Sequence, residues 1–167
     1  MTAPTATPEP GWEPAEPFPS PQDTFLADGD RVRLAYFRKP GEADLYAKAW
    51  FGAKTMGPPG HVHGGAMAAT LDEAMGAVCW MNGHKVVAAT ITINFLAMLP
   101  IETETIVQAT IDRVDGRKVY LRSTLTDLAG RKVHLRSTLT DLTGRKVTEG
   151  TGLFIVLKEE TLNSLRT

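Results

Sequence analysis

The stretch GHVHGGAMAATLDEAMG, residues 60–76, combines two histidines, two adjacent glycines and two carboxylates with a run of apolar side chains. Residues 64–82 are rich in Ala and Met and poor in β-branched residues, which favours a helix over a strand. The larger apolar side chains recur at helical spacing, at Met67, Leu71, Met75 and Val78. A helix that is apolar nearly all round is buried. The sequence therefore predicts one buried helix of about five turns.

Asp72 and Glu73 are the only charged residues of this predicted helix. An ionised carboxylate that is buried without a partner costs several kcal/mol, so at least one of the two must reach a cavity, an interface or a specific partner. Neighbouring helical residues point about 100° apart, so the two acids cannot share one role. We expect one to face a site and the other to face solvent or a partner subunit; a purely structural role for Asp72 in an interface hydrogen bond is the alternative.

Gly64 and Gly65 lie where the predicted helix begins. Free N–H groups at a helix N-terminus, with no side chains in the way, can approach a carbonyl oxygen closely, as in an oxyanion hole. The simpler alternative is a tight entry into the helix. Asp72 follows Gly65 by seven residues, about 10 Å along the helix axis. One subunit is poorly arranged to bring both groups to one reacting carbon, which indicates a site completed by a second chain.

The rest of the chain favours strands. Two segments before the helix and several after it show β-branched and aromatic residues in alternation, namely residues 31–37, 43–51, 85–99, 103–114 and 151–157. Pro100 ends the third of these, and Asp115-Gly116 marks a turn. One long helix followed by a run of strands predicts an α+β fold in which the helix covers one face of an antiparallel sheet.

The first 22 residues contain seven of the eleven prolines and predict a disordered tail, which leaves residues 23–167 as a single domain. The net charge of -1 argues against nucleic acid as a partner. No apolar run approaches the roughly 18 residues of a membrane span. Cys79 is the only cysteine, so an internal disulfide is excluded and a cytoplasmic location is expected.

The chain also contains a tandem duplication. Residues 116–129 and 130–143 match at twelve of fourteen positions, and GRKV begins a third time at Gly144. One copy amounts to a strand and its turn, and its even length preserves which side chains face inward. An added antiparallel strand would reverse the direction of the last strand, unless one copy loops out, lengthens a hairpin or swaps into a neighbour. The sequence leaves these alternatives open.

The segment of residues 60–76, with TINFL at residues 92–96, resembles the hotdog-fold acyl-CoA thioesterases, especially those of the phenylacetic-acid pathway. The resemblance covers roughly residues 43–157. It implies a five- or six-stranded sheet wrapped around the long helix, a homodimer with a continuous sheet and possible assembly into a tetramer. It also implies two sites at the dimer interface, which hydrolyse an acyl-CoA substrate.

By this resemblance, the backbone N–H of Gly64 polarises the thioester carbonyl. Asp72 of the opposite subunit acts as nucleophile or as general base for water, and Glu73 falls one position off the pattern. His63 shapes the carbonyl site and His61 lies close by, with Gly65 beside them. Relatives often carry a polar residue at the position of Gly57, and some use Ser or Thr at the position of Ala88, for which Thr90 is the nearest substitute.

Basic residues at the predicted turns, above all Arg117 and Lys118, are suitably placed to meet the phosphates of coenzyme A. No metal or organic cofactor is expected; His61 and His63 could form a metal pair, but no third ligand is evident. Two other functions are weighed against hydrolysis. One is a hotdog protein that binds acyl-CoA without turnover, and the other is a dehydratase, for which the expected acid and histidine pair on the helix is missing.

Overall fold

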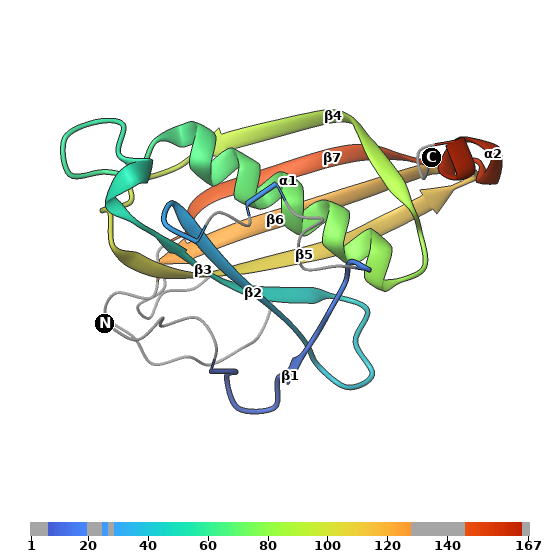
Figure 1. Ribbon diagram of the computed structural model, residues 1–167, viewed down its shortest axis with the longest axis horizontal. Coiled ribbons are helices and arrows are strands. Elements are labelled where there is room, and N and C mark those ends of the chain that lie inside the picture. The colour runs from blue at the N-terminus through green and yellow to red at the C-terminus, as the bar shows by residue number, and fades with distance from the viewer. Residues whose placement is uncertain (1–6, 20–24, 27–28, 128–145, 165–167) are drawn as a thin grey trace.

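The structure of the protein, a computed structural model, describes residues 7–19, 25–26, 29–127 and 146–164. Its main element is a seven-stranded sheet with strand order β1-β2-β3-β5-β6-β7-β4, in which all neighbouring strands are antiparallel. Figure 1 shows the sheet curving around the helix α1, which runs along its inner face. The strands and helices therefore form the predicted α+β layout of one helix against one antiparallel sheet. The sheet has more strands than the five or six that the resemblance implied, because the short strand β1 (Glu13–Pro14) adds to it beside β2.

Helix α1 spans Gly64–Met81, close to the predicted residues 64–82. Its buried side chains follow the expected spacing and pack against β3 to β7: Met67, Thr70, Leu71, Ala74, Met75, Ala77, Val78 and Cys79. Burying one Leu or Met side chain contributes roughly 2 kcal/mol. Asn82 is the C-cap of the helix. Its side-chain amide donates to the carbonyl oxygens of Val78 and Ala43, both at 2.8 Å. The buried side chains and the C-cap fix how α1 is rotated about its axis, and this sets where Asp72 and Glu73 point.

The central strands are β2 (Val32–Arg38), β3 (Leu45–Phe51), β5 (Thr103–Asp115), β6 (Lys118–Asp127) and β7 (Lys146–Val156). A short 3-10 helix, η3 (Ala53–Thr55), follows β3 and leads toward the start of α1. The inward-facing residues of the strands alternate along each strand and are buried under α1, among them Phe51, Val107, Val119, Leu121 and Leu125. The core therefore lies between the helix and one face of the sheet, as a half-buried antiparallel sheet predicts.

Strand β4 (Val86–Phe95) lies at one edge of the sheet and pairs only with β7 among the described strands. Nearly all of its residues are exposed or half-buried, although they include several large apolar side chains. Val87, Phe95, Leu96 and Met98 each expose about half of their surface. A long apolar edge strand offers unpaired backbone groups to another strand. This edge is therefore the part of the sheet most suited to pairing with another chain.

The structure differs from the expectation of a disordered tail over residues 7–19. Trp12 is buried and packs against Phe37 and Tyr46 on the outer face of the sheet, opposite α1. The strand β1 (Glu13–Pro14) pairs with β2, and Glu9 forms a 2.7 Å ion pair with the buried Lys48. The prolines suggested disorder, but the aromatic side chains between them bury enough apolar surface to order the segment. Residues 1–6 and 20–22 of the predicted tail lie outside the described residues.

The first copy of the duplication forms β6 after the turn at Gly116, and the second copy, residues 130–143, lies outside the described residues. Strand β7 pairs with β6 in antiparallel register, from Lys118 opposite Ile155 to Thr126 opposite Lys146. The last strand therefore has the direction relative to β6 that a simple hairpin gives. A reversed last strand, one of the possibilities considered for an inserted strand, is not seen.

The described chain ends with a short helix α2 (Glu159–Ser164), whose side chains are largely exposed. None of the helices in the described ranges combines the length and the apolar character needed to cross a membrane.

Candidate active site

The loop before α1 is fixed by backbone hydrogen bonds to neighbouring segments. The N–H of His63 donates to the carbonyl of Thr55 at 2.7 Å, and the N–H of Val62 donates to Leu99 at 2.8 Å. The N–H of Gly57 donates to the carbonyl of His61 at 2.9 Å, which closes the loop on itself. These bonds set the position of His63 and of the first helical residues relative to the sheet.

His63 is the N-cap of α1, and its Nδ1 accepts a hydrogen bond from the N–H of Gly65 at 2.9 Å. Because Nδ1 accepts this bond, the ring proton lies on Nε2, which remains a donor. The N–H of Gly65 is therefore occupied, whereas the N–H of Gly64 donates to no acceptor within the described ranges. Of the two glycines predicted to form the carbonyl site, only Gly64 presents a free backbone donor.

Two glycines of this region lie where a side chain has little or no room. A Cβ at Gly57 would lie 2.9 Å from the Cα of His63, a distance that requires the backbone to shift. A Cβ at Gly64 would lie 3.2 Å from the ring of Phe95 at the end of β4. The polar side chain that relatives often carry at the position of Gly57 therefore does not fit the loop of this chain. The start of α1 is also in contact with the edge strand β4.

Asp72 lies in the middle of α1 and is half-buried. Its Oδ1 is inaccessible to solvent and has no hydrogen-bond partner among the described residues. Burial raises the pKa of this carboxyl above its ordinary value of 3.8. Gly64 and Asp72 are eight residues apart in one straight helix, about 12 Å along its axis. A single chain therefore does not bring the free N–H and this carboxylate together.

Glu73, the second helix acid, is also half-buried, on the side of α1 that faces Tyr36 and Phe25. Burial and then the neighbouring Asp72 raise its pKa, while the backbone amide of Phe25 and the hydroxyl of Tyr36 lower it. The Tyr36 hydroxyl lies near this carboxylate but makes no hydrogen bond of ordinary geometry with any described residue. The two acids thus have different neighbours, as their helical positions predict, although Glu73 Oε1, like Asp72 Oδ1, is buried without a hydrogen-bond partner among the described residues.

The other predicted site residues are not gathered at the start of α1. His61 is half-buried, and its Nδ1 lies 2.8 Å from the carbonyl of Pro59 in its own loop. Thr90 is exposed on β4 beside a bulge and pairs with Leu153. Ile91, the next residue of β4, pairs with Gly152. A Cβ at Gly152 would lie 3.0 Å from the Sδ of Met75 in α1, so this pair faces the helix. By alternation the Thr90 side chain faces the outer side of the sheet, away from the helix.

Arg117, in the turn between β5 and β6, and Lys118, the first residue of β6, are exposed, and the Nε of Arg117 donates to the carbonyl of Val156 at 2.9 Å. Lys118 pairs with Ile155, and the neighbouring Val156 pairs with Val86 at the start of β4. This end of the sheet lies near the C-terminal end of α1, opposite the end where Gly64 lies (Figure 1). Within one chain the two basic residues are therefore far from the predicted carbonyl site.

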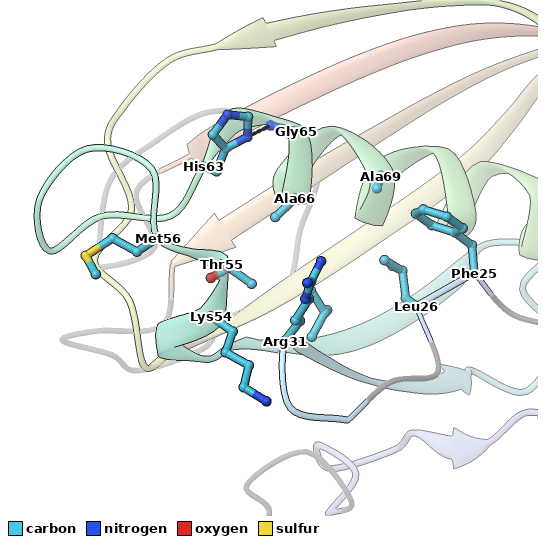
Figure 2. A pocket seen from close by; sticks show the side chains of 11 residues that line it. Phe25, Leu26, Arg31, Lys54, Thr55, Met56, His63, Gly65, Ala66 and Ala69 are labelled. Carbon is cyan, nitrogen blue, oxygen red and sulfur yellow. Dashed lines mark hydrogen bonds between the residues drawn. The ribbon is translucent and has the colours of Figure 1, made fainter.

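A pocket of about 510 Å³ adjoins the first turns of α1. Figure 2 shows it between the helix, the η3 segment and the residues that precede β2. Its described lining residues are Phe25, Leu26, Arg31, Val32, Lys54, Thr55, Met56, His63, Gly65, Ala66 and Ala69. Sequence reasoning missed this pocket, apart from His63 and Gly65, because its walls outside α1 come from residues 25–26, 31–32 and 54–56, which carry no motif. Within the part of the chain that the structure describes, no three or more His, Cys, Asp or Glu residues gather as a metal site.

An antiparallel sheet wrapped around one long helix defines the hotdog fold. The thioesterase superfamily model matches residues 59–134, which contain α1 and the strands β4 to β6. The resemblance to hotdog thioesterases and the α+β hotdog architecture, both predicted from the sequence, are thereby confirmed.

Individual proteins that resemble this chain in sequence or in structure include thioesterases and a protein solved with acetyl CoA bound. Acyl-coenzyme A thioesterase THEM4 of Bos taurus is 31% identical over 94 residues, which are 56% of this chain and 38% of that protein. The chain therefore spans about two-fifths of the length of this relative. The Escherichia coli PaaI protein from the phenylacetic acid degradation operon shares the fold with a TM-score of 0.65 at 14% identity, over 82% of this chain and 87% of its own. The protein smu.793 of Streptococcus mutans, solved with acetyl CoA bound, has a TM-score of 0.58 at 16% identity, over 70% of this chain and 82% of its own.

Proposed function

We propose that the protein is an acyl-CoA thioesterase whose active site forms between two copies of the chain. The observation that carries this proposal is that three features of one chain each lack a partner in the part of it that the structure describes. The N–H of Gly64 has no acceptor among the described residues, Asp72 has a buried oxygen without a partner there, and β4 has an unpaired apolar edge. A second copy related by a two-fold axis beside β4 would pair this edge and would bring the Gly64 N–H of one chain and the Asp72 carboxylate of the other to one substrate.

The two-fold axis follows from the geometry of the edge strand. Antiparallel pairing of β4 with its copy continues the sheet and makes the two α1 helices run in opposite directions. The start of one helix then lies toward the middle and end of the other, which supports an approach of Gly64 to the Asp72 of the partner subunit. The same rotation turns the end of the sheet that carries Arg117 and Lys118 toward the Gly64 end of the other copy. In this proposal those two residues meet the phosphates of coenzyme A.

The proposed reaction needs no metal or organic cofactor. The carbonyl oxygen of the thioester accepts the N–H of Gly64, at a helix terminus that favours negative charge. Asp72 of the partner subunit takes a proton from water as the water oxygen attacks the carbonyl carbon. The tetrahedral intermediate collapses with cleavage of the C–S bond, and the thiolate of coenzyme A takes up the proton. Asp72 can alternatively attack the carbonyl itself; the C–S bond then breaks, coenzyme A leaves as the thiolate, and water cleaves the resulting anhydride to the free acid and the Asp72 carboxylate.

The elevated pKa of Asp72 supports its role as a base, because a carboxylate with raised basicity accepts a proton from water more readily. His63 contributes the donor at Nε2 beside the carbonyl site, and its Nδ1 fixes the first turn of the helix through Gly65. In this arrangement His63 positions the Gly64 amide and does not transfer a proton.

Release of free thiol from a panel of acyl-CoA substrates tests the proposal. We expect the wild-type protein to hydrolyse at least one of them and Asp72→Asn to reduce kcat/KM by roughly 100-fold or more. Glu73→Gln is the matched control, since it removes the adjacent carboxylate, which points about 100° away around the helix, and we expect it to retain most of the activity.

Two outcomes contradict hydrolysis through Asp72. One is that Asp72→Asn releases thiol as fast as the wild type. The other is that the wild type binds acyl-CoA and releases no thiol from any member of the panel. The second outcome supports the alternative function, acyl-CoA binding without turnover, which the lack of a polar side chain at Gly57 and Ala88 favours.

A further inference from the structure

The pocket beside α1 has an apolar wall and a cationic one. Ala66 and Ala69 of the helix, together with Phe25, Leu26, Val32 and Met56, form its apolar surface. The charged residues among the described lining are Arg31 and Lys54, and none of the described lining residues is acidic. The described lining is thus cationic, whereas the whole chain has a net charge of -1; the carboxylate of Asp30, which pairs with Lys54, lies outside this lining. A concave surface of one sign attracts ligands of the opposite sign.

The two cations are placed differently. Lys54 lies at the rim, where its Nζ is 2.6 Å from the carboxylate of Asp30 and its side chain points away from the helix (Figure 2). Arg31 points toward the part of the helix that carries Ala66 and Ala69 (Figure 2). A guanidinium carries five N–H donors, so Arg31 can bind an oxyanion while it keeps another contact. Arg31 is therefore the cation that a ligand in this pocket meets.

The position of the pocket links Arg31 to the proposed carbonyl site. His63 and Gly65 line one end of the pocket, and Ala69 lies four residues further along the helix, about 6 Å. The small side chains of Ala66 and Ala69 leave room for a ligand that follows the helix surface. A thioester whose carbonyl is at the start of α1 can thus extend one of its two arms past Arg31.

We propose that Arg31 determines specificity by binding an anionic group of the thioester substrate in this pocket. This inference rests on the proposed function. The anion has two sources with the same chemistry, namely a carboxylate at the far end of the acyl group and a phosphate of coenzyme A. Both are planar or tetrahedral oxyanions that a guanidinium binds through paired hydrogen bonds.

Ligand binding in the Asp72→Asn background tests this inference without turnover. Dissociation constants are measured by calorimetry for valeryl-CoA, glutaryl-CoA and valeryl-pantetheine, with Arg31 and with Arg31→Met. Valeryl and glutaryl groups have equal chain length and differ in the terminal carboxylate, whereas valeryl-pantetheine lacks the nucleotide phosphates. Loss of a hydrogen-bonded charge contact corresponds to a change of about tenfold or more in a dissociation constant.

Each source of the anion predicts its own result. If the anion is the acyl carboxylate, Arg31→Met lowers the preference for glutaryl-CoA over valeryl-CoA about tenfold. If the anion is a phosphate, Arg31→Met lowers the preference for valeryl-CoA over valeryl-pantetheine by a similar factor. Arg38→Met is the matched control, because Arg38 lies at the other end of β2, paired with Glu13 and outside the pocket lining, and both preferences should remain unchanged in it.

The proposal is overturned if Arg31→Met leaves both preferences within twofold of their original values while its thermal unfolding matches that of the parent. Failure of the proposed function is a separate result, since it appears as the absence of thiol release from the wild-type protein. The binding preferences are measured in a variant that does not depend on turnover, so the two failures are distinguishable.

Discussion

Asp72 has an elevated pKa because it is partly desolvated, and this makes the stability of the fold depend on pH. A carboxyl whose pKa is higher in the folded than in the unfolded chain favours the fold while it is protonated. This contribution is present below the ordinary value of 3.8 and is lost as the pH rises through the elevated folded-state pKa. Asp72→Asn cannot ionise, so we expect its melting temperature at pH 7 to exceed that of the wild type.

Thermal unfolding of both proteins between pH 3 and pH 8 measures this difference. The gap in melting temperature should widen as the pH rises above the ordinary Asp pKa. A variant that is less stable than the wild type at pH 7 would show that the Asp72 carboxylate has a stabilising partner, which is the structural role considered above as the alternative to catalysis.

The backbone of His63 approaches Gly57 so closely that the loop leaves no room for a side chain at this position. In Gly57→Ala the new Cβ would lie 2.9 Å from the Cα of His63, and the loop that positions the helix start would have to move. We expect a loss of about 1–3 kcal/mol in unfolding free energy, together with reduced kcat/KM. Denaturant unfolding and thiol release measure the two effects.

Gly76→Ala is the control for this substitution. Its Cβ would lie 4.0 Å from the nearest atom, in the ring of Phe154, and Ala is favoured over Gly inside a helix by roughly 0.5–1 kcal/mol. We expect the control to be at least as stable as the wild type. Equal stability of the two glycine variants would mean that the loop at Gly57 accommodates a side chain.

At this scale the sequence offered Gly64, His63 and Asp72 as candidate site residues, because a glycine pair before an apolar helix and an acid inside that helix are local features. It did not predict that the Gly65 N–H is occupied, since this depends on the side-chain conformation of His63. Arg31 was missed because its place beside the helix depends on how distant segments pack.

The edge strand β4 is the element on which the proposed dimer depends. Ile91 lies in the middle of this strand, 38% exposed, on the same face of the sheet as α1. A charge at this position must be desolvated when two copies pair. We expect Ile91→Lys to weaken dimer formation at least tenfold, about 1.4 kcal/mol, and to lower activity in parallel.

Sedimentation velocity over a range of concentrations measures the association. Val114→Lys is the control, because Val114 is 44% exposed near the end of β5, away from the β4 edge. If Ile91→Lys is as dimeric and as active as the control, the copies do not associate through β4.

The segment of residues 7–19 stabilises the outer face of the sheet. Trp12 is only 5% exposed and contacts both Phe37 and Tyr46. Trp12→Ala should lower the unfolding free energy by about 3 kcal/mol, as expected for truncating a buried aromatic residue. Phe25→Ala, which removes an aromatic side chain that is 85% exposed, should change it much less. Chemical denaturation compares the two, and equal effects would contradict a structural role for this segment.

The elements were largely predictable, because periodicity is a local property. The helix and the strands agree with their predicted ranges to within a few residues, except that β7 begins at Lys146, earlier than the predicted residue 151. The tail was misjudged because proline content says nothing about the partners of Trp12. Which strand lies at the edge of the sheet was not predicted, since strand order depends on long-range pairing.

For the whole molecule, the duplication gives a direct test of how much of the chain the fold needs. Removing residues 130–143 leaves β6 and β7 joined by four residues, a common length for a hairpin loop. We expect the shortened protein to fold and to retain thiol release, because β6 already pairs with β7 along its length. Circular dichroism and activity measure this, and loss of the folded state would show that the second copy is required.

Convergence of two subunits at one site is the central claim of this account, and mixing two inactive variants tests it most directly. Gly64→Pro removes the proposed N–H donor. Proline is well tolerated at the first position of a helix, but the Phe95 ring, 3.2 Å from a Cβ at Gly64, must shift slightly to admit it. Asp72→Asn removes the proposed base. In a heterodimer of the two variants, one of the two shared sites contains both an intact Gly64 and an intact Asp72.

The measurement is the rate of thiol release after the two variants are unfolded together and refolded as a mixture. Random pairing makes half of the dimers mixed, with one of two sites intact, so the account predicts recovery of about a quarter of wild-type activity. If the mixture is no more active than the separate variants, although both form dimers, Gly64 and Asp72 do not act across the interface and the account is contradicted.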